Sequence, residues 1–174
     1  MQTKGEPVAH SVPAQAVVDE ILRLNVDYIV NVPDSIQRTL LELLSRQEKL
    51  KYLTVCTEDE AMGINAGLYA GGMNSILCIQ NNGLFACLNT IKAIALDARV
   101  PTPMFVGQFG RDVTKPPSES RNRAVRMLGP TLDTWGVPHY PLEGPRDLCN
   151  IAKAFERAHQ DKGPSVVIIG ARTS

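Results

Sequence analysis

Short, almost continuously apolar runs alternate with segments of helical spacing along the chain. Runs of four to seven such residues are typical of strands buried on both faces, and we predict six, at residues 26–32, 52–56, 75–80, 103–106, 137–141 and 165–169. Apolar residues three and four apart predict helices at residues 12–24, 35–44, 59–70, 84–96, 123–135 and 146–159. Asp34 or Ser35 would cap the second helix. This alternation predicts an α/β fold: a doubly wound, six-stranded, mainly parallel sheet with helices on both faces.

The composition narrows the classes of partner. The chain has 174 residues, enough for one domain, and only 5% are aromatic, so we expect an aliphatic core. Lys plus Arg and Asp plus Glu are balanced at 18 each, which gives no reason to expect nucleic acid or an anionic membrane as partner. No signal peptide and no membrane-length apolar run is recognisable. We therefore expect a cytoplasmic protein with a flexible segment at residues 1–11.

The cysteines form no Cys-x-x-Cys pair. Cys56 and Cys78 stand in predicted strands and Cys87 in a predicted helix. We expect these three residues and Cys149 to be buried, reduced thiols rather than to have a redox or metal role.

Polar residues gather where the first three predicted strands end. Ligands of open parallel sheets bind outside the carboxyl ends of the strands. Residues 33–35 read Pro-Asp-Ser, residues 57–60 read Thr-Glu-Asp-Glu and residues 80–83 read Gln-Asn-Asn-Gly. Taken singly, each segment also has a structural explanation, because acids and hydroxyl residues cap helices and Asn-Gly segments form turns.

The helix predicted at residues 59–70 is poor in side-chain bulk. Its small residues continue past its end, and they are Ala61, Gly63, Ala66, Gly67, Ala70, Gly71 and Gly72. Glycine inside a helix costs on the order of 1 kcal/mol relative to alanine. Several glycines together therefore indicate close approach of another backbone, either the neighbouring sheet or a second subunit.

Common catalytic motifs are absent from the sequence. It contains neither of the glycine-rich phosphate loops, no His-Glu-x-x-His and no Gly-x-Ser-x-Gly, which disfavours a generic nucleotide-binding α/β protein. His10, His139 and His159 are scattered, and we predict no catalytic triad and no metal site.

The strand-end segments, in this order, resemble the pyrimidine-binding (Pyr) domain of thiamine diphosphate (ThDP) dependent enzymes. The residues that carry the resemblance are Val32-Pro33-Asp34-Ser35, then Glu58, Ala61, Ala66-Gly67, Tyr69 and Gly72, then Gln80-Asn81-Asn82-Gly83-Leu84 with Asn89. Within the family the pattern is most similar to sulfopyruvate decarboxylase alpha subunits and the corresponding half of phosphonopyruvate decarboxylases. It spans roughly residues 12–170 and is most specific over residues 55–100.

The resemblance implies that a glutamate activates the cofactor. In this family the glutamate after the second strand hydrogen-bonds N1′ of the aminopyrimidine ring, and the spacing to the following Ala-Gly pair gives this role to Glu58. Glu60 is the alternative, and Asp59 matches less well. A carboxylic acid in a poorly solvated pocket can share a proton with N1′, because burial disfavours the charged form.

The resemblance also implies which residues line the pocket. The predicted cofactor-binding residues, besides Glu58, are Gln80, Asn81, Asn82 and Gly83. The loop after the first strand would face the substrate through Ser35 and Asp34. The sequence departs from the family where Asn82 replaces a usual serine and Phe85 a usual glycine, which leaves the substrate open.

A second departure follows the fourth strand. Relatives tend to carry an Arg-Gly segment there, whereas residues 107–112 read Gly-Gln-Phe-Gly-Arg-Asp. Arg111 is our candidate for binding an anionic group of the substrate. The polar stretch at residues 114–123 predicts an exposed loop, whose Lys115, Arg121 and Arg123 either reach the substrate or are solvated.

The half of the family's site that holds the diphosphate through Mg²⁺ has no counterpart here. The family uses a Gly-Asp-Gly segment for it, and the sequence contains none. We therefore expect a beta subunit that carries this domain and the Mg²⁺, in an αβ, α2β2 or larger assembly. The small-residue helix is a candidate for the interface between the two chains.

These inferences predict the alpha subunit of a two-chain, ThDP-dependent 2-oxo acid decarboxylase, a carboxy-lyase. Its substrate would be a small anionic 2-oxo acid, sulfopyruvate or phosphonopyruvate. The alternatives are a carboligase, a decarboxylase of another 2-oxo acid, and a non-catalytic Pyr-like regulatory subunit. The sequence leaves open whether residues 111–126 form a lid.

Overall fold

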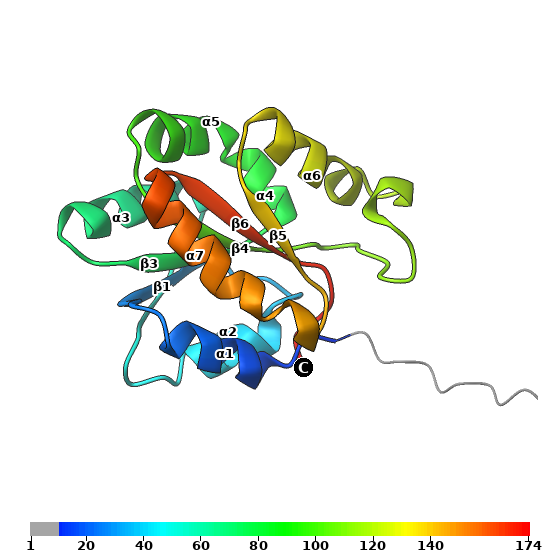
Figure 1. Ribbon diagram of the computed structural model, residues 1–174, viewed down its shortest axis with the longest axis horizontal. Helices are drawn as coiled ribbons and strands as arrows, with labels where there is room; N and C mark the ends of the chain where they lie inside the picture. The colour runs from blue at the N-terminus through cyan, green and yellow to red at the C-terminus, as the bar shows by residue number, and fades with distance from the viewer. Residues whose placement is uncertain (1–10) are drawn as a thin grey trace, which may run out of the picture.

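All six strands are parallel and lie in the order β2-β1-β3-β4-β6-β5 (Figure 1). The computed structural model describes residues 11–174, so residues 1–10 of the segment expected to be flexible lie outside the described part. The strands are β1 (Tyr28–Asn31), β2 (Lys51–Thr54), β3 (Ser75–Gln80), β4 (Thr102–Gly107), β5 (His139–Leu142) and β6 (Pro164–Ile169). The predicted fold class is confirmed.

Helices connect the strands and cover both faces of the sheet. The α-helices are α1 (Ala14–Leu22), α2 (Arg38–Leu44), α3 (Glu58–Ala70), α4 (Asn81–Ala86), α5 (Leu88–Thr90), α6 (Arg123–Thr134) and α7 (Cys149–Asp161). A π-helix, η1 (Ile91–Asp97), follows α5, and two short 3₁₀-helices are η2 (Pro117–Glu119) and η3 (Pro145–Asp147). Between residues 11 and 174, no helix has both the length and the apolar character that a membrane crossing requires.

The alternation of side chains along the strands builds two hydrophobic cores. Ile76 and Cys78 of β3 face the layer formed by α1, α2 and α7. Leu77 and Ile79 face the opposite layer, formed by α3 to α6 (Figure 1). Burying one such aliphatic side chain stabilises the fold by about 1.5–3 kcal/mol, so the central strands anchor both layers.

The order of the strands creates a switch point between β1 and β3, and we call the region outside the carboxyl ends of these strands the crevice. The chain passes from β1 outward to β2, and then returns to place β3 on the other side of β1. Loops that leave neighbouring strands in opposite directions separate at such a switch point, where α/β sheets bind ligands. The segments that follow β1 and β3 therefore flank the predicted binding region.

Two helix boundaries differ from those expected. The predicted second helix begins at Arg38 instead of residue 35, and neither Asp34 nor Ser35 caps it. The Asp34 carboxylate is occupied elsewhere, because it accepts hydrogen bonds from the Ile36 amide and from the side chains of Gln37 and the distant Gln80. The predicted fourth helix begins earlier, at Asn81 directly after β3, and is interrupted at Cys87 before it widens into η1.

The cysteines divide into two groups. Cys78 and Cys87 are buried and free, as expected, and burial raises the pKa of the Cys87 thiol to about 12. The expectation of burial was wrong for Cys149, which is exposed at the first residue of α7. It was also wrong for Cys56, which is exposed. The reason is that β2 is an edge strand that ends at Thr54, which leaves Cys56 in the open turn before α3.

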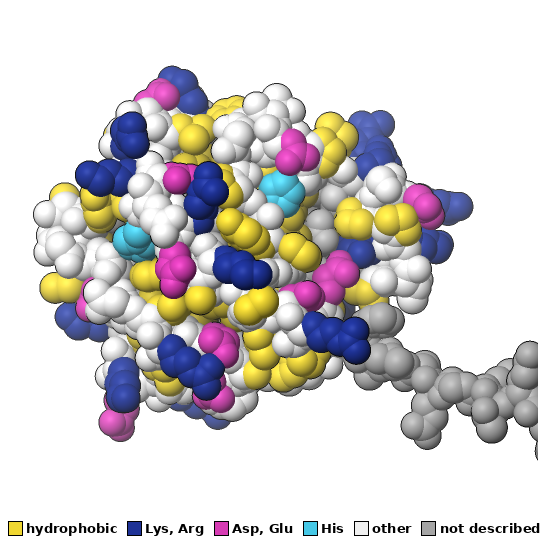
Figure 2. Space-filling view, viewed as in Figure 1, with side chains coloured by type: hydrophobic (Ala, Val, Ile, Leu, Met, Phe, Trp, Pro, Cys, Tyr) yellow, Lys and Arg dark blue, Asp and Glu magenta, His cyan; other side chains and the backbone are white. Residues whose placement is uncertain are grey.

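Charged side chains are distributed without large fields of one sign on the visible face. Figure 2 shows Lys and Arg interspersed with Asp and Glu over the face that α7 crosses. This distribution agrees with the balanced composition.

Candidate active site at the strand ends

The three acids at the start of α3 have three different environments. Thr57 caps the helix, since its hydroxyl accepts a hydrogen bond from the Glu60 amide at 3.2 Å, and Glu60 Oε2 in return accepts one from the Cys56 amide at 2.9 Å. Asp59 accepts a hydrogen bond from the Thr90 hydroxyl. Glu58 is half-buried, and within residues 11–174 its carboxylate has no hydrogen-bond partner. The structural explanation therefore accounts for Glu60 and Asp59 but leaves Glu58 free to bind a ligand.

Glu58 lies directly against Gly83, in the first turn of α4. A β-carbon on Gly83 would lie 2.5 Å from Cγ of Glu58 and would collide with its carboxyl group. Only glycine leaves room for the carboxyl group there. The structure thus brings together two residues that the sequence proposed for one cofactor site.

The buried thiol of Cys87 lies near the carboxylates of Asp59 and Glu58. Its pKa is raised mainly by burial and further by the negative charges of Asp59 and Glu58. The thiol is therefore protonated at neutral pH and is no candidate nucleophile.

Asp34 lies at the centre of a buried hydrogen-bond network rather than on an open surface. Only 4% of its surface is exposed. Its Oδ1 accepts hydrogen bonds from the Ile36 amide and from Gln80 Nε2, both at 3.0 Å, and its Oδ2 accepts one from Gln37 Nε2 at 3.1 Å. Gly107 leaves room for the Asp34 carboxyl group, since a β-carbon on residue 107 would lie 2.9 Å from Cγ of Asp34. Asp34 thus ties the ends of β1, β3 and β4 together.

Gln37 is a functional candidate that sequence reasoning missed. It is fully buried, and its Nε2 also approaches the carbonyl oxygens of Ile79 and Phe105, at 2.9 and 3.3 Å. A signal was present in the sequence, because Gln37 occupies the apolar stripe of α2 with Leu40, Leu41 and Leu44. A lone amide in such a stripe indicates a buried polar contact.

The segment after β3 divides its side chains between the crevice and the protein. Gln80 donates to Asp34 and accepts a hydrogen bond from Asn82 Nδ2 at 3.0 Å. Asn81 is fully buried and forms two hydrogen bonds with the backbone of Phe109. Its Nδ2 donates to the Phe109 carbonyl oxygen and its Oδ1 accepts from the Phe109 amide, both at 3.3 Å. Of these three amides, that of Asn82 is the exposed one.

Ser35 borders an open cavity of about 390 Å³ between α2 and β2. It is exposed, and Arg38, Tyr52 and Thr54 line the same cavity. Burial raises the pKa of the Tyr52 phenol to about 12, so Tyr52 presents a neutral hydroxyl. Arg38 is the cation nearest the predicted substrate loop in this lining, and sequence reasoning missed it.

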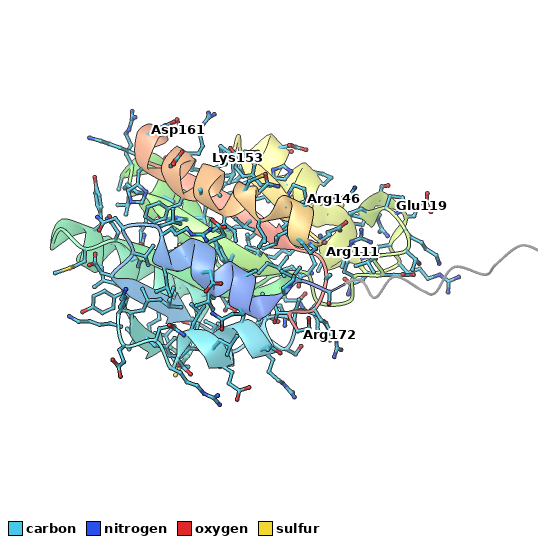
Figure 3. All side chains as sticks on the ribbon, turned by 60° about the horizontal axis from the view of Figure 1, so that its bottom comes forward. Arg111, Glu119, Arg146, Lys153, Asp161 and Arg172 are labelled. Atoms are coloured by element: carbon cyan, nitrogen blue, oxygen red, sulfur yellow. The ribbon has the colours of Figure 1, made fainter. Side chains whose placement is uncertain are left out.

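Arg111 lies at the end of β5, where Glu143 follows the strand. Its Nη2 lies 2.9 Å from Oε1 of Glu143, its Nη1 donates to the carbonyl oxygens of Asp112 and Lys115, and 5% of its side chain is exposed. Figure 3 places Arg111 at the same end of the molecule as Arg146 and Arg172. Arg111 and Asp34 form no hydrogen bond or ion pair with each other. Each is held by its own partners. The loop at residues 114–123 is largely exposed, as predicted.

Metal-binding side chains are not clustered in the described part of the chain. Among residues 11–174, no three His, Cys, Asp or Glu residues are arranged to hold a metal ion.

Sequence comparison identifies relatives among decarboxylases. The chain is 29% identical over 159 residues to the sulfopyruvate decarboxylase subunit alpha of Methanococcus maripaludis, a match that covers 91% of this chain and 94% of that protein. It is 25% identical to the subunit alpha of Methanocaldococcus jannaschii, over 79% of this chain and 80% of that protein. It is 29% identical to the phosphonopyruvate decarboxylase of Streptomyces viridochromogenes, over 69% of this chain and 30% of that protein. No protein-family profile matches the chain.

These matches confirm the resemblance and the enzyme class, carboxy-lyase, that the strand-end residues predicted. Two of the relatives are named as alpha subunits, and such a name implies a partner subunit. The phosphonopyruvate decarboxylase is a longer protein, of which this chain matches one part.

Proposed function

We propose that this chain, a relative of sulfopyruvate decarboxylase alpha subunits and phosphonopyruvate decarboxylases, is the pyrimidine-binding subunit of a ThDP-dependent 2-oxo acid decarboxylase. One observation carries the proposal. Of the three neighbouring acids at the start of α3, Glu58 is the one without a hydrogen-bond partner among the described residues, and it lies half-buried against a glycine at the crevice.

The environment of Glu58 fits the aminopyrimidine end of ThDP. A half-buried carboxyl group without a partner can form a hydrogen bond to a ring nitrogen and exchange a proton with it. When bound, the cofactor supplies a thiazolium ring that stores the electron pair released as carbon dioxide leaves. Glu58 would hold the proton at N1′, and the bare backbone of Gly83 would let it approach.

The buried network behind the crevice would keep this site rigid. Asp34 accepts three hydrogen bonds, and one of them fixes Gln80 at the end of β3. Gln80 in turn orients the exposed amide of Asn82. In this proposal Asn82 and Gly83 face the cofactor, Gln80 and Asn81 position that segment, and Asp34 acts through Gln80.

We propose that the substrate is a small 2-oxo acid with a second anionic group, sulfopyruvate or phosphonopyruvate. These are the substrates in the names of the relatives. Ser35 and Arg38 share an open cavity at the strand ends, where a hydroxyl and a guanidinium could bind a sulfonate or phosphonate. Arg111 could take this role only by leaving Glu143.

We also propose that a beta subunit holds the Mg²⁺ and the diphosphate, and that it binds along α3. Apart from the helix's own backbone, no atom of residues 11–174 lies within 4 Å of a β-carbon placed on Gly63 or Gly67. The sheet therefore does not explain these glycines. A partner backbone packed against Gly63 and Gly67 would account for these glycines.

A carboligase, or a decarboxylase of another 2-oxo acid, is the alternative. Phe85 favours it, because this half-buried side chain stands one turn beyond Asn81, where the family commonly has glycine. A different pocket shape would change the acyl group that the enzyme accepts. It would not change the role proposed for Glu58.

The test is the release of carbon dioxide from sulfopyruvate and phosphonopyruvate in the presence of ThDP and Mg²⁺. The full chain is assayed alone, with the product of a neighbouring decarboxylase beta-subunit gene, and with Glu58→Gln or Glu60→Gln. We expect release only with the partner, lost in Glu58→Gln and kept in Glu60→Gln. If the complex fails to bind ThDP, the proposal is wrong; if it binds ThDP but releases no carbon dioxide, the substrate assignment is wrong.

A further inference from the structure

A second cavity lies away from Glu58, near the other edge strand of the sheet, β5. It has a volume of about 300 Å³ and is bounded by α6, η2 and the ends of β5 and β6. Its walls include three prolines and one isoleucine, which are Pro117, Pro130, Pro141 and Ile168. A cavity of about 150 Å³ lined by apolar groups holds benzene, so this one can hold a ring or branched chain with a polar substituent.

Gln108 makes this cavity more than an apolar hollow. It follows β4, lines the cavity and has only 2% of its surface exposed. Its backbone is hydrogen-bonded to Ile169 and Arg111, but within residues 11–174 its side-chain amide has no partner. The polar atoms of this amide are not sealed from solvent, so a ligand in the cavity can reach them.

The charges around the cavity favour an anion. The guanidinium of Arg126 lines it and uses Nη1 to donate to the carbonyl oxygen of Ser120 at 2.6 Å, which leaves its other N–H groups available. The carboxylate of Glu143 also lines it but is already paired with Arg111 at 2.9 Å. Arg126 thus lines the cavity with N–H groups to spare, whereas the charge of Glu143 is neutralised by Arg111, so the balance is positive.

His139 completes the polar wall. Its Nδ1 lies 3.2 Å from the carbonyl oxygen of Val137, an arrangement that requires the proton on Nδ1. Its Nε2 faces Gly129 of α6, where a β-carbon would lie 3.9 Å away in ordinary contact. The missing side chain of Gly129 therefore leaves open space in the wall of the cavity.

We propose that this cavity binds a small monocarboxylate with an apolar body. The carboxylate would accept hydrogen bonds from the Arg126 guanidinium and the Gln108 amide, and the apolar body would contact the prolines and Ile168. The site is separate from the proposed decarboxylase site, so the two proposals stand independently.

Calorimetric titration of the full chain tests the proposal, with benzoate as the probe. Neutral benzamide and cationic benzylamine have nearly the same shape and are the comparison ligands. We expect benzoate to bind at least about tenfold more tightly than either, a difference of about 1.4 kcal/mol. Equal affinity for the three ligands, tighter binding of benzylamine, or no benzoate binding up to about 10 mM would overturn the proposal.

Three variants locate the binding. Gly129→Leu fills the cavity and should abolish benzoate binding, whereas its matched control Gly129→Ala should retain it, because the added methyl group meets only His139. Gln108→Glu places a second carboxylate against the ligand and should weaken benzoate at least about tenfold. This variant keeps the test decisive if Gly129→Leu, which precedes Pro130, unfolds. Unchanged benzoate binding in folded Gln108→Glu would show that the probe binds elsewhere.

Discussion

Two pairs of glycines in this molecule have opposite surroundings. Gly83 and Gly107 stand at strand ends, where a β-carbon would collide with the carboxyl group of Glu58 or of Asp34. Gly63 and Gly67 stand on α3, where nothing in the described chain outside the helix backbone lies within 4 Å of an added β-carbon. The first pair is required by the chain's own fold. The second pair has no explanation inside the chain, which points to a partner.

The two pairs of glycines serve different parts of the proposed enzyme: the first shapes the subunit's own site, and the second lies where we propose that the beta subunit binds. The strand-end glycines allow two carboxyl groups to pack directly against backbone, one held by three donors and one left without a partner among the described residues. The helix glycines destabilise α3 by on the order of 1 kcal/mol each, and no contact within the described chain offsets this loss. In the proposed complex, contact with the beta subunit offsets this loss of stability.

Gly83→Ala should have the largest effect on activity. The new methyl group displaces the Glu58 carboxyl group, whose flexible side chain can rotate away at modest cost in stability. Loss of a positioned proton donor lowers rates by about 100-fold or more, and we expect a fall of that size in carbon dioxide release by the complex. The matched control, Gly144→Ala in the same complex, should stay close to wild type, because nothing lies within 4 Å of a β-carbon at that position.

Gly107→Ala should have the largest effect on stability. The β-carbon would lie 2.9 Å from Cγ of Asp34 and 3.1 Å from Cβ of Ile36, and neither can retreat, because Asp34 is held by three donors. We expect the free energy of unfolding to fall by about 2–3 kcal/mol, measured by urea titration. A loss below about 0.5 kcal/mol would mean that the Asp34 network is loose.

Gly67→Leu should damage association more than folding. The side chain has open space in the lone chain, so its thermal unfolding should match or exceed that of wild type. If the beta subunit packs on α3, its affinity should fall at least about tenfold, or 1.4 kcal/mol, in a direct binding assay. Unchanged affinity would place the interface elsewhere on the molecule.

Gly63→Ala in the lone chain should have the smallest effect, with the opposite sign. Alanine is favoured over glycine inside a helix, and no neighbour obstructs its methyl group. We expect the free energy of unfolding to rise by about 0.5–1 kcal/mol. A decrease instead would reveal a contact that makes this glycine necessary for the fold.

The sequence predicted the elements well because their periodicity is local. The order of strands and helices follows from apolar spacing, and every predicted element has its counterpart in the structure. The start of α2 was misplaced, because the carboxylate of Asp34 is taken by Gln80, which is 46 residues away in the chain. Cys56 was misjudged because its exposure depends on β2 being an edge strand, which is a property of the topology.

The candidate site was predictable only in part for the same reason. Three neighbouring acids look alike in the sequence, and the resemblance to a family was needed to choose Glu58 among them. The contacts that separate them come from Cys56, Thr90 and Gly83, and the last two lie on other elements. The pairing of Arg111 with Glu143 joins residues 32 positions apart, which no local pattern indicates.

The most direct test of the central claim is the rate at which the complex exchanges the C2 proton of bound ThDP for deuterium, followed by NMR. This rate reports activation of the cofactor without any substrate. We predict that Glu58→Gln slows the exchange by about 100-fold or more, whereas Glu60→Gln changes it by no more than about threefold. Exchange that slows in Glu60→Gln and not in Glu58→Gln, or in neither, would contradict the assignment of Glu58 as the activating residue.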